Sequence, residues 1–258
     1  MKYKAKRLAE RFVAVLSQWP GVECVSLNEA ALPDTLDPYF ALIMDVFYRD
    51  GIPGPEERRR LFGGDILAFE TSAQGNKDRF LVGDMPVRLE FKDIARADEL
   101  VSFLDAKRSS LWLIKDSGTY GFYRLAQGEL LFNRSQWIDG IRRRLSAPDE
   151  GFWLKVRDSS QSKMEHFLSD LGAAMLQEDD FYYLMSSSGF IKYACLTLFC
   201  INKRFEPSHR GYYKQVAELP ILPESFPVRL ETFLRPGSEP AERKYALAQL
   251  MARGIVAL

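Results

Sequence analysis

The sequence predicts an α/β domain with a mixed sheet over residues 1–115, followed by an all-helical bundle domain over residues 116–258. Two observations support this division. Before Asp116, short apolar runs typical of strands alternate with amphipathic helical segments and with turns rich in Gly and Pro. After Asp116, long segments carry apolar residues at helical spacing.

The first domain is expected to begin with a helix and two strands. Apolar residues at helical spacing predict a helix over Lys4–Trp19, which Pro20 and Gly21 end. Val22–Leu27 is expected to form a short strand and residues 28–38 a polar loop. Tyr39–Phe47 is almost continuously apolar, which is typical of a strand that is buried on both faces.

The rest of this domain reads as a mixture of helices and strands. A helix is predicted where Pro55 and two acids occupy a first turn, and a β-hairpin where Gly83 and Asp84 separate two strand-like runs. The expected elements are a helix over 55–62, a strand over 66–70, hairpin strands over 79–82 and 86–92, a helix over 98–106 and a short strand over 111–115.

The second domain is expected to contain helices only. Ser162 and Glu165 form a capping-box pattern, which predicts a helix start at Ser162. Gly254 is expected to stop the last helix. The predicted helices cover 135–145, 162–175, 181–204 and 239–252, with a Pro-rich connector over 207–227 that contains one short helix.

Composition limits the function classes. Lys plus Arg and Asp plus Glu both number 35, so a whole-chain electrostatic footprint for nucleic acid is not expected. The three cysteines lie in apolar runs, which is typical of reduced thiols in a cytosol. The N-terminus lacks an apolar signal core, and the most apolar window, 190–201, is shorter than a membrane span. A cytoplasmic protein without a membrane partner is therefore expected.

Two acids interrupt strands that are otherwise apolar. Asp45 lies between Met44 and Val46, and Glu90 lies between Leu89 and Phe91. A buried carboxylate without a partner is costly, so each acid needs a ligand or a counter-charge. Asp45 reads as a metal ligand, as the buried partner of an arginine such as Arg88, or as a strand-edge residue. Glu90 reads as a site residue. Because it shares strand parity with Arg88, the alternative is that both side chains lie on a solvated face.

Other polar residues have weaker functional readings. Asp37 precedes Pro38 and is either a turn residue or a site residue that reaches in from the loop. The runs 58–60 and 142–144 are arginine triplets, read as solvated helix faces with phosphate or RNA binding as the alternative. His209, Arg210 and Lys214 are the better basic candidates for a ligand contact.

The order of these elements resembles the nucleotidyltransferase fold. In that fold a Gly-Ser pair follows the first strand, an acid-x-acid pair lies on the second strand, and one more acid lies on a later strand. Here Val22–Leu27 is similar to the first strand, Met44–Phe47 to the end of the second, and Val87–Phe91 to the later strand.

The second half carries an independent resemblance, to the C-terminal bundle of bacterial minimal nucleotidyltransferases related to kanamycin nucleotidyltransferase. In those proteins a helix ends in an Asn-Arg-Arg-Tyr-like turn, which is followed by a Pro, a basic residue and a Leu-Pro pair. The similar residues here are Asn202, Lys203, Arg204, Phe205, Pro207, Lys214, Leu219 and Pro220.

The chain departs from the family pattern at its chemical positions. Leu27 and Asn28 replace the Gly-Ser pair, and only one carboxylate, Asp45, lies on the second strand. The resemblance therefore implies a nucleotidyltransferase-like protein with a degenerate active site, which binds a nucleotide or a partner in the cleft between its domains.

Two alternatives stay open. In the first, the chain is an active transferase that modifies a hydroxyl of a small molecule or protein. Asp45 and Glu90 then hold Mg²⁺ as catalytic residues, and Asn28 and Lys214 contact a nucleoside triphosphate. In the second, the chain is a non-enzymatic scaffold that binds RNA or protein.

Overall fold

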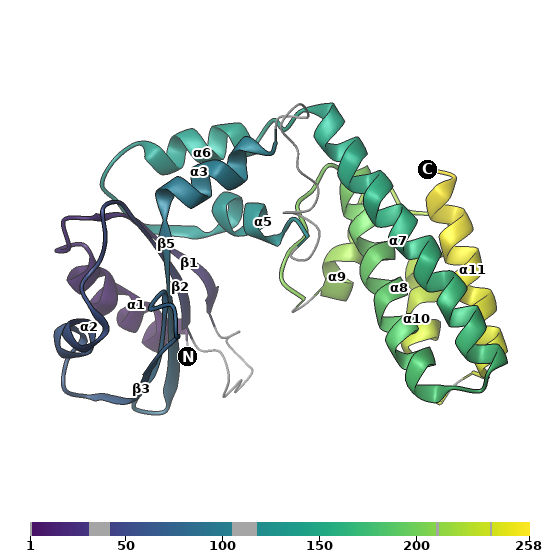
Figure 1. Cartoon of the computed structure of the whole chain (residues 1–258), viewed down its shortest axis with the longest axis horizontal. Helices are drawn as coiled ribbons and strands as arrows, with labels where there is room; N and C mark the ends of the chain where they lie inside the picture. The colour runs from purple at the N-terminus through teal and green to yellow at the C-terminus, as the bar shows by residue number, and fades with distance from the viewer. Residues whose placement is uncertain (1, 31–41, 105–117, 210–211, 238) are drawn as a thin grey trace. The chain divides into compact units, whose positions relative to one another are not determined.

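The computed structural model describes residues 2–30, 42–104, 118–209, 212–237 and 239–258 (Figure 1). The chain forms two compact units. The sheet unit comprises Met1–Ser102 and Arg124–Ala147, and the bundle unit comprises Phe103–Tyr123 and Pro148–Leu258. The boundary passes through helix α5 (Tyr120–Gln127), which begins in the bundle unit and ends in the sheet unit.

The sheet unit contains a six-stranded mixed sheet with the order β3-β4-β5-β2-β1-β6. Strands β2 and β5 run parallel, and every other neighbouring pair is antiparallel. The strands are β1 (Val22–Ala30), β2 (Leu42–Tyr48), β3 (Ile66–Thr71), β4 (Lys77–Val82), β5 (Met85–Asp93) and β6 (Glu129–Asn133).

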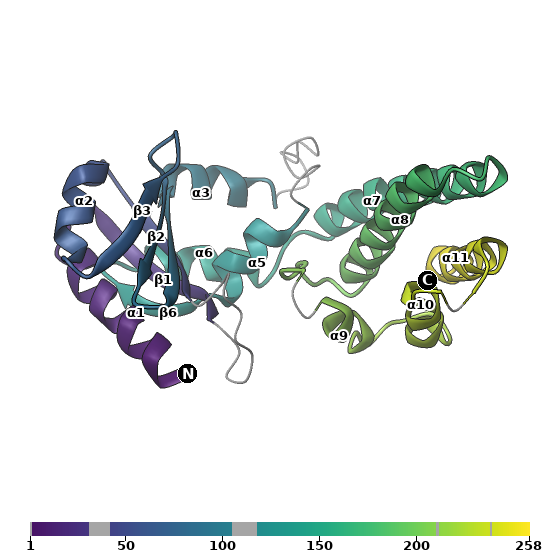
Figure 2. The ribbon, with the colours of Figure 1, turned by 90° about the horizontal axis from the view of Figure 1, so that it is seen from below.

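Helices cover both faces of this sheet (Figure 2). Helices α1 (Lys2–Leu16) and α2 (Pro55–Phe62) lie on one face, where Phe12, Phe62 and alternate strand residues form one buried apolar cluster. Helices α3 (Ile94–Ser102) and α6 (Trp137–Leu145) lie on the other face together with α5. Because side chains alternate along a strand, residues of β5 that do not face α1 face this second layer.

Most predicted elements of this unit are confirmed. Helix α2 has the predicted bounds, and β4 and β5 form the predicted hairpin, with Gly83 at a φ of 62° in the turn. Helix α3 begins at Ile94, four residues before the predicted start, directly after β5. The strand predicted over 111–115 lies outside the described residues.

The expectation that only helices follow residue 115 is wrong. Strand β6 pairs antiparallel with β1, and the segment Arg124–Ala147 groups with residues 1–102 in the sheet unit. The five residues ELLFN are short and weakly alternating, so they carry little strand signal of their own. They form a strand because the exposed edge of β1 offers backbone partners.

The bundle unit contains helices α7 (Glu150–Leu176), α8 (Asp180–Ile201), α9 (Tyr212–Ala217), α10 (Phe226–Leu234) and α11 (Ala241–Val256). Side chains from all five helices form one apolar core, in which Phe190, Leu198 and Ala248 are fully buried. The expected all-helical bundle is confirmed for this part of the chain. Helix α10 was not expected, since Pro227 in its first turn reads as part of a connector.

The helix start predicted at Ser162 and the helix stop predicted at Gly254 are both wrong. Ser162 lies in the middle of α7, whose N-cap is Asp149, and the Asp149 carboxylate accepts a hydrogen bond from the Gly151 amide. Gly254 lies inside α11, which continues to Val256. A Cβ at position 254 would lie 2.7 Å from the Pro223 ring, so close packing explains this glycine better than a helix stop does.

Helix α8 is the one described helix that is long and apolar enough to cross a membrane. The sequence expectation considered residues 190–201 alone, which are shorter than a membrane span. Half of its most apolar window is buried inside the bundle unit. Ten of its residues, including Phe190 and Phe199, are buried in this helix, so a role as the core helix of the bundle accounts for its apolar character.

Candidate functional site

Asp45 and Glu90 lie side by side on the sheet. They are register partners across the parallel pair β2–β5, so their side chains share one face. The Asp45 side chain is fully buried, and the Glu90 side chain is 12% exposed. The structure therefore brings together the two acids that the sequence singles out.

One guanidinium joins the two carboxylates. The Nη2 and Nε atoms of Arg124 donate to Asp45 Oδ1 at 2.5 Å and to Asp45 Oδ2 at 3.1 Å. The Nη1 atom of Arg124 donates to Glu90 Oε2 at 2.8 Å. Arg124 projects from helix α5 and its side chain is only 9% exposed, so this is a buried bridge with charge-assisted hydrogen bonds.

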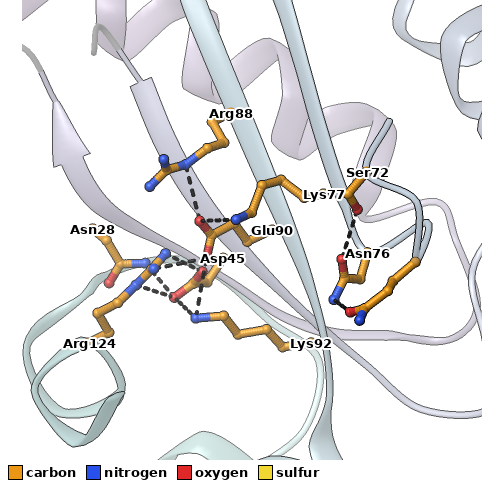
Figure 3. A network of polar contacts seen from close by, with 10 residues as sticks. Asn28, Asp45, Ser72, Asn76, Lys77, Arg88, Glu90, Lys92 and Arg124 are labelled. Carbon is orange, nitrogen blue, oxygen red and sulfur yellow. Dashed lines mark hydrogen bonds and ion pairs between the residues drawn. The ribbon is translucent and has the colours of Figure 1, made fainter. Parts of the chain in front are cut away.

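Three further cations surround the two acids (Figure 3). Lys92 Nζ lies 2.9 Å from Asp45 Oδ2 and 3.8 Å from Glu90 Oε2. Arg88 Nε lies 3.1 Å and Lys77 Nζ lies 3.7 Å from Glu90 Oε1. We call the set of Asp45, Glu90, Lys77, Arg88, Lys92 and Arg124, with Asn28, the Asp45–Glu90 network.

Asn28 enters this network from strand β1. Its Nδ2 atom donates to Asp45 Oδ2 at 2.7 Å. Gly128, between α5 and β6, packs so closely here that a Cβ would lie 2.8 Å from Asn28 Oδ1 and 3.1 Å from Ser26 Oγ. Ser26 is buried beside Asp45 in register, and its hydroxyl has no hydrogen-bond partner within the described residues.

Electrostatics keep Glu90 ionised. Burial raises the pKa of Glu90, but the charges of Arg124, Lys92, Arg88 and Lys77 outweigh burial and hold that pKa below its ordinary value. The network therefore stabilises the Glu90 anion with protein cations.

The donor set does not fit a two-metal centre. Such a centre needs several carboxylates that hold two cations about 3.5 to 4 Å apart. Within the described residues, no group of three or more His, Cys, Asp or Glu side chains is placed to hold a metal ion. Asp45 and Glu90, the predicted Mg²⁺ ligands, both have their oxygens in contact with Arg124 and Lys92.

The structure assigns the predicted site residues to different units. Asp45, Glu90 and Asn28 belong to the sheet unit and contact one another through the network. Lys214 lies on α9 in the bundle unit, where its Nζ atom is 3.9 Å from Glu218 Oε1 and its side chain is 80% exposed. His209 is also in the bundle unit, with its ring edge-on to that of Tyr212, while Asp37 and Arg210 lie outside the described residues.

The interpretation of Asp45 as the buried partner of an arginine is confirmed, but the arginine is Arg124 and not the suggested Arg88. Sequence reasoning missed Arg124 because it lies 79 positions away, in a segment that reads as part of the helical domain. Lys92 could have been found, since it shares strand parity with Arg88 and Glu90.

The first arginine triplet does not form a fully solvated face. Arg58 is buried, and its Nε and Nη2 atoms donate to the two oxygens of Asp78 at 2.7 and 2.8 Å. Its guanidinium also donates to the backbone oxygens of Pro53 and Gly75 and lies over the Phe91 ring. Arg59 and Arg60 are exposed, as the pattern predicts.

Similarity to known proteins is found by comparison of structures and not by comparison of sequences. No protein-family model matches the chain, and a search of curated proteins finds no match. Among solved structures, a nucleotidyltransferase-like protein from Exiguobacterium sibiricum 255-15 is similar, with a TM-score of 0.49 and 12% identity. The alignment covers 95% of this chain and 72% of that one.

Proposed function

We propose that this chain is a nucleotidyltransferase-like protein that binds a nucleotide at the Asp45–Glu90 network and does not transfer a nucleotidyl group. The observation that carries this proposal is the Arg124 guanidinium, which hydrogen-bonds both carboxylates at once. Carboxylates held in this way are not available as a pair of metal ligands, and metal-assisted transfer depends on such a pair.

The network supports binding of an anion because its cationic side chains outnumber its two carboxylates. Four cationic side chains surround two carboxylates within the described residues. Asn28, at the position where the resembling fold has its phosphate loop, adds an amide beside Asp45. All three cysteines are free and buried, in keeping with a protein of the reducing cytosol, where nucleotides are abundant.

Two measurements on the full chain test this proposal. Calorimetry with ATP, GTP, CTP and UTP, with and without Mg²⁺, should give saturable binding of at least one triphosphate. A pyrophosphate-release assay with hydroxyl acceptors should give no product. Release that disappears in Asp45→Asn, but persists in the exposed-site control Asp84→Asn, would show an active transferase and overturn the proposal.

A further inference from the structure

The lysines of the network retain hydrogen-bonding capacity beyond the acids that they flank. Lys77 Nζ and Lys92 Nζ lie 3.7 and 3.8 Å from the two different oxygens of Glu90, which is longer than a hydrogen bond. An ammonium group has three donors, and Lys92 directs one of them to Asp45 at 2.9 Å. Among the contacts of the described residues, both ammonium groups therefore keep donors for another acceptor.

Both lysines also reach solvent. The Lys77 and Lys92 side chains are 34% and 32% exposed, while the carboxylates that they flank are buried or nearly buried. Lys77 is the register partner of Glu90 on β4, and Lys92 lies two residues beyond Glu90 on β5, so all three share one face of the sheet. The solvent-facing layer of the network is therefore cationic, and its acids lie beneath.

We propose that Lys77 and Lys92 bind a phosphate group of the ligand directly, without a metal ion between protein and phosphate. This inference rests on the proposed function, because it names how that nucleotide is held. Lysine ammonium groups bind phosphate oxygens as point charges. Arg124 and Arg88 together supply two positive charges beside Asp45 and Glu90, so the acids repel the incoming anion less than an unpaired pair would.

The ligand class is an uncomplexed phosphate or polyphosphate. A Mg²⁺-nucleotide complex is less suited to this surface, since the complexed cation would face the two ammonium groups. The same chemistry is present in a nucleoside triphosphate and in free pyrophosphate. The base and sugar distinguish the two sources, so the probes must include both.

The experiment is calorimetry on the full chain with ATP, pyrophosphate and adenosine, each in EDTA and in Mg²⁺. We expect ATP to bind in EDTA at least as tightly as in Mg²⁺. Lys77→Gln should weaken binding about tenfold, as for the loss of one charge-assisted phosphate contact. Lys6→Gln, at an exposed position of α1 on the other face of the sheet, is the matched control and should bind as the unchanged protein does. Lys214→Gln, in the bundle unit, tests the other lysine that the sequence singles out.

The outcomes separate the two proposals. ATP binding that requires Mg²⁺, or that Lys77→Gln and Lys92→Gln both leave unchanged, overturns direct phosphate binding but leaves nucleotide binding intact. Weakening by Lys214→Gln alone would assign the phosphate contact to Lys214 and would also overturn direct phosphate binding by Lys77 and Lys92. Binding of pyrophosphate as tight as ATP supports the phosphate contact and contradicts a nucleotide as the ligand. Circular dichroism of each variant establishes that it is folded.

Discussion

The Arg124 guanidinium donates two hydrogen bonds to the Asp45 carboxylate, at 2.5 and 3.1 Å, and thereby connects helix α5 to the centre of the sheet. Asp45 is fully buried, so the charge of this carboxylate is compensated by its neighbours and not by water. Arg124 is the one residue whose guanidinium hydrogen-bonds both Asp45 and Glu90 within the described structure.

Replacement of Arg124 by Met should destabilise the sheet unit strongly. The change removes the guanidinium and leaves a buried carboxylate with weaker compensation, which typically costs about 3 to 5 kcal/mol. Urea unfolding followed by circular dichroism measures this loss. The double variant Asp45→Asn with Arg124→Met should recover part of it, because both charges are then removed. A double variant less stable than Arg124→Met would contradict a charge-compensating role.

The pH dependence of stability should reflect Glu90. Its pKa in the fold lies below the ordinary value, so the stability that it contributes is fully present above a pH of about 4.5 and is lost as pH falls through the folded pKa. Unfolding midpoints measured between neutral and acidic pH should fall in that window. Glu90→Gln should flatten the acid side of the curve, whereas an unchanged slope in this variant would assign the acid sensitivity to other carboxylates.

Arg58→Met should cost about 3 to 5 kcal/mol as well, since it leaves the fully buried Asp78 without its bidentate partner. Arg59→Met is a matched control in the next position of the same helix, where the side chain is exposed. The control should change the free energy of unfolding by about 0.5 kcal/mol or less. Equal effects of the two substitutions would contradict the assigned difference between their environments.

The positions of the two acids could be predicted from the sequence, but their chemical state could not. A single acid in each of two apolar strands implies that both need compensation, and the parallel register of β2 and β5 places them together. Arg124 follows no pattern that connects it to either acid. Its position depends on the pairing of β6 with the edge of β1. This long-range pairing cannot be predicted from the five residues of β6, because they show only weak alternation.

The arginine triplet 58–60 shows the same dependence on tertiary contacts, over a shorter sequence distance. A run of three arginines on a helix predicts a solvated face, and two of the three residues obey that rule. Arg58 departs from it because one face of α2 packs onto the sheet, where Asp78 of β4 offers a buried carboxylate. Local pattern therefore describes the average residue of a charged run, while tertiary contacts decide the individual one.

Gly189 should be intolerant of a side chain, because α7 and α8 approach closely there. A Cβ at this position would lie 2.4 Å from Phe167 Cδ1, and the ring is held against Tyr193 by stacking. Gly189→Ala must therefore separate the two helices or displace the ring, and overpacking of this kind costs about 1 to 3 kcal/mol. Urea unfolding of the full chain measures the effect.

Gly140 in helix α6 provides the control for this substitution. A Cβ there meets nothing within 4 Å, so Gly140→Ala should stabilise the protein by about 0.5 to 1 kcal/mol through helix propensity alone. Opposite signs for the two glycine substitutions are the expected result. Stabilisation by Gly189→Ala would mean that the α7–α8 pair is not packed as closely as the position of Phe167 implies.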